Sequence, residues 1–171
     1  MKDMYLYCRI LGLSAPWFVG DVELDTAGGR VDVHVKHAAV VRWRSPTCGC
    51  ELACWDYAEP RVWRHLDICQ FKTFLHAWVP RMGCSEHGVL QVKMSWAEAK
   101  GRFTLLMERL IIDVLRECAP MTGACRLMRI SWDEAWNVMD RAVWRGQARK
   151  RVTSTRYLGI DEKPSIRGTT T

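Results

Sequence analysis

Cysteine and histidine residues with the spacing of zinc ligands lie in two short segments of the sequence. The segment Cys84-Ser-Glu-His87-Gly88 is a complete zinc knuckle: two ligands lie three residues apart on a tight turn, and the glycine lets backbone N–H groups approach them. The segment Thr47-Cys48-Gly49 is incomplete, because position 45 holds a serine, whose hydroxyl stays protonated near neutral pH. The two segments therefore predict three of the four ligands of a structural zinc site, namely Cys48, Cys84 and His87.

Two further cysteines beside the first segment are candidates for the fourth ligand. Cys50 and Cys54 follow Cys48 closely, so either one reaches the same metal after a local rearrangement. The alternative is that these three cysteines are unligated thiols, since the sequence lacks an intact C-x2-C…C-x2-H pattern. We include Cys50 in the predicted metal site, with Zn²⁺ as the structural cofactor.

A second candidate site is the stretch Met121–Val143, which has the pattern of two short helices joined by a tight turn. In the second helix, the side chains of Ser131 and Glu134 each accept a backbone N–H from the other residue, which is a capping box. Two such helices form a helix–turn–helix, which inserts its second helix into the major groove of DNA. Apolar residues recur at helical spacing along the second helix: Trp132, Ala135, Trp136, Met139, Ala142 and Val143.

Charged residues in this stretch argue both for and against DNA binding. Asn137 and Arg141 are its obvious base readers, and a run of cations that would hold phosphates follows. Against DNA, Arg129 lies where such turns favour glycine, and Asp133 and Asp140 are acids that phosphates repel. The alternatives are a corner of a helical bundle and a solvated basic helix or linker. The predicted DNA-binding residues are Asn137, Arg141, Arg145, Arg149, Lys150 and Arg151.

The elements that must position these residues follow from the hydrophobic pattern. A short amphipathic helix is expected over residues 2–13. A β-hairpin follows, with strands at Val19–Leu24 and Val31–Val35 and a turn at Ala27–Gly29, because apolar and polar residues alternate with a period of two. A third strand is expected at Val40–Trp43.

The segment between the two knuckles contains a further expected strand, residues 71–79. Its aromatic residues are expected to pack the small core of the zinc-binding module. Residues 93–101 are polar and carry no strong signal, and a long amphipathic helix is expected from about Arg102 to Glu117. The aromatic residues of the predicted core are Trp63, Phe71, Phe74 and Trp78, while His34, His37, His65 and His76 are assigned no chemistry.

The composition limits the class of protein. The 171 residues suffice for one or two small domains, and the net charge of +6 fits a nucleic-acid partner. No apolar run approaches the roughly 20 residues that span a bilayer. The first residues also lack the pattern of a signal peptide, so a cytoplasmic protein without membrane association is expected.

Several motifs, in this order, resemble the N-terminal half of bacterial DDE insertion-sequence transposases of the ISL-three group. The resemblance runs from about Leu6 to Lys163. Each motif alone is weakly specific, but together they form a strong signal. The motifs are Trp63-Arg-His-Leu-Asp67, Pro80-Arg81 with Cys84-x-x-His87-Gly88, Arg102-Phe103-Thr104, and Leu158-Gly-Ile-Asp-Glu-Lys163.

The resemblance implies a zinc-binding head, DNA binding through the second helix of Met121–Val143, and a ribonuclease-H-like catalytic domain. It implies that Asp161 corresponds to the first catalytic carboxylate, which in the full-length family binds divalent metal such as Mg²⁺. Three departures stand out: Ser45 replaces a cysteine, Arg129 replaces a glycine, and the chain ends about ten residues after Asp161. One acidic residue cannot complete a two-metal site, so the expectation is a truncated or decayed transposase.

We expect an α+β protein with a small β-rich zinc-ribbon-like head, a three-helix helix–turn–helix unit and a truncated strand. The expected parts are residues 1–95, 96–151 and 152–171. The expected function is binding of double-stranded DNA at transposon ends in DNA transposition, with a second copy or a full-length transposase as possible partners. Alternatives are a zinc-ribbon and helix–turn–helix transcriptional regulator, an enzyme completed by another chain, and a poorly folded remnant. Whether the chain itself is an enzyme stays open.

Overall fold

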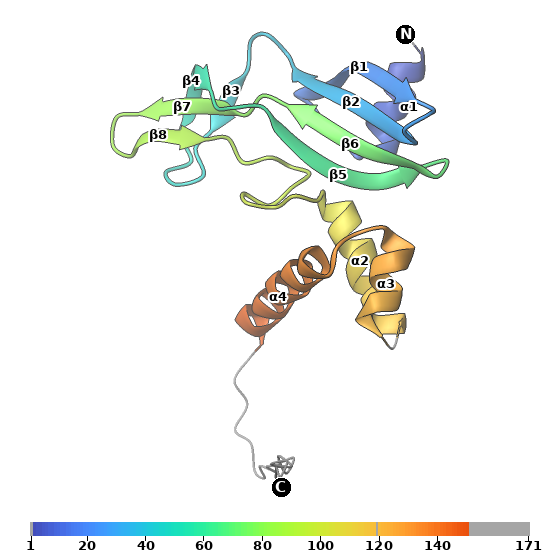
Figure 1. Cartoon of the computed structure of the whole chain (residues 1–171). Helices are drawn as coiled ribbons and strands as arrows, with labels where there is room; N and C mark the ends of the chain where they lie inside the picture. The colour runs from blue at the N-terminus through green and yellow to red at the C-terminus, as the bar shows by residue number, and fades with distance from the viewer. Residues whose placement is uncertain (1, 119, 151–171) are drawn as a thin grey trace, which may run out of the picture.

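The computed structural model describes residues 2–118 and 120–150, which form an α+β protein with two four-stranded sheets and four helices (Figure 1). One helix precedes the strands, and the other three follow them. The elements in chain order are α1 (Lys2–Ile10), β1 (Trp17–Asp25), β2 (Arg30–His37), β3 (Arg42–Arg44), β4 (Glu51–Tyr57), β5 (Arg61–Ile68), β6 (Phe71–Ala77), β7 (Pro80–Cys84), β8 (Gly88–Gln91), α2 (Leu105–Glu117), α3 (Met121–Met128) and α4 (Trp132–Arg149).

The first sheet has the strand order β1-β2-β6-β5. The helix α1 packs against β1. The β1–β2 hairpin and the strand β6 confirm the period-two pattern read from the sequence. Strands β2 and β6 pair in parallel, whereas the other neighbours in this sheet are antiparallel. Alternate residues of β2, namely Val31, Val33 and Val35, are buried, so one face of the sheet forms the core.

The second sheet, with the order β3-β4-β7-β8, is entirely antiparallel. The strand expected at Val40–Trp43 exists as β3, but it pairs with β4 and so starts the second sheet. Pairing of β4 with β7 brings together segments that lie before and after the β5–β6 hairpin in the sequence. The two knuckle segments therefore meet at one end of this sheet.

The β5–β6 hairpin lies between the knuckles in sequence but belongs to the first sheet. The expectation that its aromatic residues form one core is wrong in part. Trp63 is fully buried, whereas Trp78 is 57% exposed because it lies just after the end of β6. Residues 93–101 form no helix, as expected, yet Met94 and Trp96 are buried in the main core.

Four tryptophans hold the two sheets and the 93–101 segment together. Trp17 of β1 lies 4.8 Å from Trp96 and 5.2 Å from Trp43 of β3, measured between ring centroids. Trp63 of β5 lies 5.8 Å from Trp96 on the other side. Aromatic contacts at these distances add to the free energy of hydrophobic burial, so this cluster fixes the position of the second sheet relative to the first.

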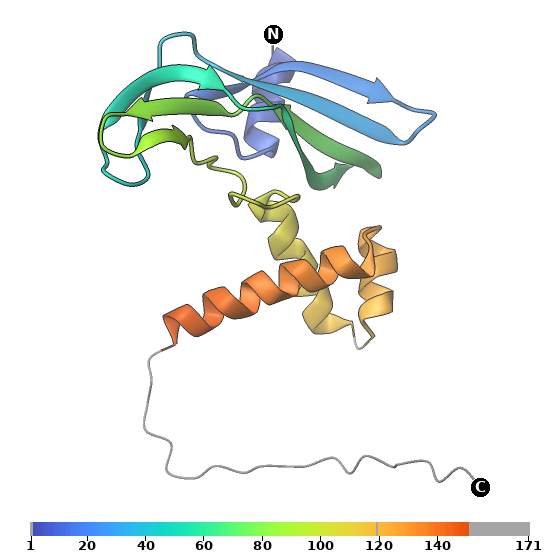
Figure 2. The same cartoon turned by 60° about the vertical axis from the view of Figure 1, so that its left-hand side comes forward.

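The three C-terminal helices pack against one another beneath the sheets (Figure 2). The expected helix at 102–117 starts at Leu105, because the Thr104 side chain caps it by accepting the N–H of Met107. The core shared by the three helices contains Met107 and Ile111 of α2, Met128 of α3 and Val138 of α4.

The apolar face predicted for α4 is only partly the buried one. Ala135 and Val138 are buried, and their short side chains allow α4 to approach α2 closely. Trp132 and Trp136 stack on each other at 5.3 Å and are each about half exposed. Among the described residues, no helix combines the length and the apolar composition needed to cross a membrane.

Candidate functional site

Three of the predicted metal ligands lie together at the end of the second sheet. The Sγ atoms of Cys48 and Cys84 are 3.8 Å apart, and Cys84 Sγ lies 3.5 Å from Nδ1 of His87. The donor atoms of Cys48, Cys84 and His87 all lie within 4.8 Å of one another, the only such group in the described part of the chain.

These distances fit zinc. Around a tetrahedral zinc with Zn–S bonds of about 2.3 Å and Zn–N bonds of about 2.0 Å, two sulfurs lie about 3.8 Å apart and a sulfur and a nitrogen about 3.5 Å apart. The observed distances of 3.8 Å between the two sulfurs and 3.5 Å between Cys84 Sγ and His87 Nδ1 match the corresponding two edges of this tetrahedron. Two thiols and an imidazole are also the donor types that zinc prefers.

The backbone around the cluster has the conformation expected of zinc knuckles. Gly49 and Gly88 follow the ligands Cys48 and His87 and have φ angles of +75° and +69°, which favour glycine. The backbone N–H groups of Glu86 and His87 lower the pKa of the Cys84 thiol. A hydrogen bond with the Ser45 side chain lowers the pKa of the Cys48 thiol, and the N–H of Cys50 adds to this. Lower thiol pKa values favour the thiolate form that binds metal.

Ser45 occupies the position of the missing ligand and preserves the turn. Its hydroxyl oxygen accepts the backbone N–H groups of Thr47 and Cys48, both at 3.3 Å, and its side chain is buried. Its own N–H donates to the carbonyl of Cys50 at 2.8 Å, which closes the loop. The turn before Cys48 is therefore formed with a serine at position 45.

The two candidates for a fourth ligand differ in their surroundings. Cys50 is exposed, and its pKa is raised mainly by the neighbouring Cys48 thiol. The Cys54 thiol donates to the carbonyl oxygen of Asp56 at 3.2 Å. The group of donor atoms that lie within 4.8 Å of one another contains neither Cys50 nor Cys54, so the structure does not bring the predicted ligand Cys50 together with Cys48, Cys84 and His87.

The turn between α3 and α4 has a left-handed residue where the sequence suggested one. Arg129 has φ = 53° and ψ = 45°, the conformation that glycine adopts most easily. Its backbone N–H donates to the Arg126 carbonyl at 3.2 Å. Its side chain forms an ion pair with Asp67 and donates to the Gln70 carbonyl at 2.8 Å. These contacts tie the turn to the end of β5 and offset the cost of the left-handed conformation.

The predicted capping box is present at the start of α4. The Ser131 hydroxyl accepts the N–H of Glu134 at 3.1 Å, and the Glu134 carboxylate accepts the N–H of Ser131 at 2.9 Å. This double cap sets the first turn of α4 directly after Arg129, so the turn and the second helix are both defined by local hydrogen bonds.

The residues predicted to bind DNA fall into three groups. Asn137, Arg149 and Lys150 are exposed on α4 or at its end. Arg141 and Arg145 instead contact Glu108 of α2, at 2.5 Å and 3.4 Å, and the Glu108 side chain is only 2% exposed. Arg151 and the predicted catalytic residue Asp161 lie outside the described residues.

A groove of about 620 Å³ runs between the segment that leads into α2 and the first half of α4. Two exposed cations, Lys100 and Arg102, line the side formed by the segment. Neither these two cations nor Glu108 is among the functional residues predicted from the sequence. A basic pair just before the α2 cap was visible in the sequence, but the long-range partners of Glu108 were not. The groove is lined by Lys100, Arg102, Phe103, Ser131, Asp133, Glu134, Asn137 and Arg141.

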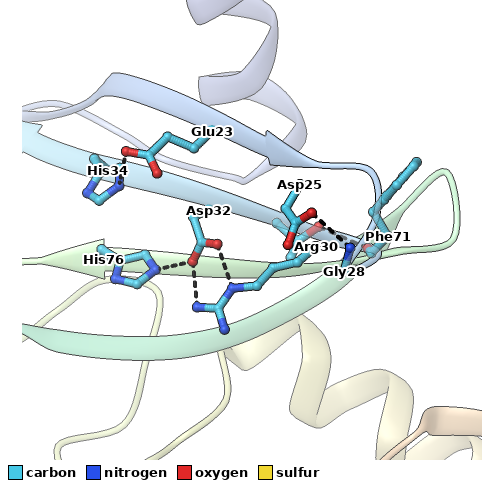
Figure 3. Close-up of polar contacts among 9 residues, drawn as sticks. Glu23, Asp25, Gly28, Arg30, Asp32, His34, Phe71 and His76 are labelled. Atoms are coloured by element: carbon cyan, nitrogen blue, oxygen red, sulfur yellow. Dashed lines mark hydrogen bonds and ion pairs between the residues drawn. The ribbon is translucent and has the colours of Figure 1, made fainter.

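Two of the histidines that were assigned no chemistry, His34 and His76, lie in a polar network on the first sheet (Figure 3). His76 of β6 pairs with Asp32 of β2, and Asp32 also pairs with Arg30 at 2.5 Å. His34 stacks on His76 at 4.9 Å and pairs with Glu23 at 3.4 Å. Glu23 and Asp32 thus each have a cationic or imidazole partner, which fits a structural role across three neighbouring strands.

Comparison with known families gives matches to two consecutive domains. Residues 41–87, which contain the Cys48, Cys84 and His87 group, match the zinc finger of transposase IS204/IS1001/IS1096/IS1165. Residues 92–143, which contain α2, α3 and most of α4, match the helix–turn–helix domain of transposase family ISL3. Both matches agree with the resemblance read from the sequence motifs.

Curated relatives cover nearly the whole chain. The transposase for insertion sequence element IS1557 from two strains of Mycobacterium tuberculosis is 30% identical over an alignment of 169 residues that covers 95% of this chain. The chain spans 38% of the length of that relative. No solved structure matches the chain significantly.

Proposed function

Because the chain carries the zinc-finger and helix–turn–helix domains of the ISL3 family of insertion-sequence transposases, we propose that it recognises transposon-end DNA. In this proposal α2, α3 and α4 form a three-helix DNA-reading unit. The helix α4 enters the major groove, and the β-rich part supports it. The corresponding parts are residues 1–95, 96–151 and 152–171, the last of which would start the catalytic domain with Asp161.

The observation that carries this proposal is the junction between α3 and α4. A left-handed residue, Arg129, and a capping box that begins two residues later join α3 to α4 by a short turn, which supports the arrangement that helix–turn–helix proteins use. The junction lies inside the region that matches the helix–turn–helix domain. On α4, the exposed Asn137 is suited to a bidentate contact with adenine. Arg149, Lys150 and Arg151 would hold phosphates.

For the metal group we propose structural zinc bound by Cys48, Cys84 and His87. The fit of the distances to a zinc tetrahedron supports this assignment. Zinc there would tie the end of β7 to the loop before β4 and so stabilise the second sheet. We further propose that Cys50 moves to supply the fourth ligand. Cobalt(II) absorption of the wild type and of Cys50→Ser tests this, because loss of a thiolate ligand weakens the charge-transfer band; Cys54→Ser serves as the control.

DNA binding is tested by fluorescence anisotropy with the whole chain, using inverted-repeat ends and scrambled DNA of equal length across a salt series. Tighter binding to the ends than to scrambled DNA supports end recognition, and Asn137→Ala should then reduce that preference. Binding that is equal for both DNAs contradicts end recognition but keeps general DNA binding. Absence of binding at low salt overturns the proposal.

The same samples address partners and catalysis. Sedimentation with and without DNA shows whether two copies bind one DNA, as the proposed homodimer requires. Cleavage assays with Mg²⁺ or Mn²⁺ test whether the chain contributes Asp161 to a reaction. Cleavage that disappears in Asp161→Ala would assign an enzymatic role to the chain, possible only together with carboxylates from elsewhere.

A further inference from the structure

We propose that Lys100 and Arg102 bind the DNA backbone beside α4, whereas Arg141 and Arg145 orient α4 and do not contact phosphate. This inference rests on the proposed DNA binding and names the residues of that interface. The sequence predicted that the cations of α4 bind DNA, and it did not predict this role for the cations before α2.

The first reason is that Arg141 and Arg145 are already engaged. Both reach across to the carboxylate of Glu108, which is almost completely buried between α2 and α4. Arg145 also lies 3.6 Å from Glu98. Turning either arginine toward a phosphate would weaken the pairing of a buried carboxylate, which is strongly unfavourable. These two side chains are therefore the ones on α4 least able to gain contacts with DNA.

The second reason is that Lys100 and Arg102 are exposed and available. Neither forms an ion pair within the described part of the chain. Both lie on the groove whose opposite wall is the first half of α4 and includes Asn137. A phosphodiester strand placed in the groove would meet these two cations while α4 faces the bases.

The third reason is that the backbone of residues 99–102, which carry Lys100 and Arg102, is held in place. The guanidinium of Arg61 donates to the carbonyls of Ala99 and Gly101, at 2.6 Å and 3.0 Å. The N–H of Arg64 donates to the carbonyl of Arg102 at 2.8 Å. The backbone at Lys100 and Arg102 is thus held by hydrogen bonds from β5. A backbone that is already ordered lowers the entropic cost of contacting a ligand.

Acidic residues decide on which side of the groove a phosphate can lie. Asp133 and Glu134 line the wall formed by α4, and the Glu134 carboxylate is held by the N–H of Ser131. Like charges repel, so the backbone strand must follow the wall formed by Lys100 and Arg102. This placement also explains how a helix with exposed acids can still face DNA.

The test is the salt dependence of DNA binding by the full chain. The slope of log K against log salt is negative, and each lost phosphate contact reduces its magnitude by about 0.9. The double variant Lys100→Gln/Arg102→Gln should therefore reduce that magnitude by about 1.8. The control Arg9→Gln/Lys36→Gln removes two exposed charges from α1 and β2 and should leave the slope unchanged. Thermal melts of both variants check that each is folded.

The outcomes separate this inference from the proposed function. If the wild type does not bind DNA at low salt, the proposed function fails. If the wild type binds and Lys100→Gln/Arg102→Gln keeps the full slope, the inference is overturned while DNA binding stands. Arg141→Gln should leave the slope unchanged in the folded protein. A decrease of about 0.9 in the magnitude of the slope would show that Arg141 contacts a phosphate and would also overturn the inference.

Discussion

Asp67, in β5, forms ion pairs with both Arg64 of the same strand and Arg129 in the turn between α3 and α4. The Arg64 side chain is buried, and Arg129 is the left-handed residue of that turn. One carboxylate therefore compensates a buried charge and connects the β-rich part to the helical part.

Asp67→Asn should destabilise the protein, because it removes a charged partner from two arginines at once. We expect a loss of about 2–3 kcal/mol in the free energy of unfolding, at the low end for a broken buried pair since Asp67 is partly exposed. Urea denaturation measures it. Asp56→Asn is the matched control, because it breaks the more exposed pair with Arg81 and should cost less than about 1 kcal/mol. Equal losses in the two variants would contradict a special role for Asp67.

Glu108→Gln should loosen α4 from α2. The substitution keeps the size of the side chain but removes the charge that Arg141 and Arg145 share, and we expect a loss of about 3 kcal/mol in the free energy of unfolding. Glu117→Gln, at an exposed position of the same helix, should change it by less than about 0.5 kcal/mol. A stability of Glu108→Gln equal to that of the wild type would mean that the cluster is not structural.

Protonation of His65 should make stability fall in acid. Burial, with a smaller contribution from Arg64, lowers the pKa of His65 from 6.5 to about 4. The ring is neutral in the folded protein and becomes protonated first in the unfolded chain. The contribution is therefore fully present above pH 6.5 and is lost as the pH falls toward 4, by about 3 kcal/mol in total.

The measurement for His65 is urea denaturation of the wild type and of His65→Gln between pH 7.5 and 4.5. The Nδ1 atom of His65 lies 2.8 Å from the hydroxyl of Thr104, so glutamine retains the ability to form a hydrogen bond. The difference between the two proteins should shrink as the pH falls. A constant difference would assign the acid sensitivity to other groups, such as Asp32, whose pKa is lowered mainly by Arg30.

Ser45→Cys should strengthen metal binding. The serine already accepts the two N–H groups that a ligand thiolate would accept, so a cysteine there places a thiolate beside Cys48 without rebuilding the turn. We expect zinc affinity, measured by competition with a chelator, to rise by about tenfold or more. Cys84→Ser should abolish binding, and Cys54→Ser should leave it unchanged. A Ser45→Cys protein with wild-type affinity would show that the fourth position is already filled.

The sequence predicted features that depend on neighbouring residues. The β1–β2 hairpin and the capping box of Ser131 and Glu134 were identified because period-two alternation and capping hydrogen bonds are local. The positive φ angles of Gly49, Gly88 and Arg129 follow from the same kind of local signal. The spacing of the two knuckle segments predicted the grouping of Cys48, Cys84 and His87 and left the fourth ligand open, and the family resemblance implied the same three ligands.

Tertiary structure decided which distant segments pair. Periodicity gives the face of a strand but not its neighbour, so the sequence could not show that the β5–β6 hairpin leaves the knuckles and joins β2. It also could not show that Arg141 and Arg145 would be engaged by a buried carboxylate 33 and 37 residues away. Residue type determined that these arginines carry charge. Burial of Glu108 determined that this charge holds α4 in place, because a buried carboxylate must be paired.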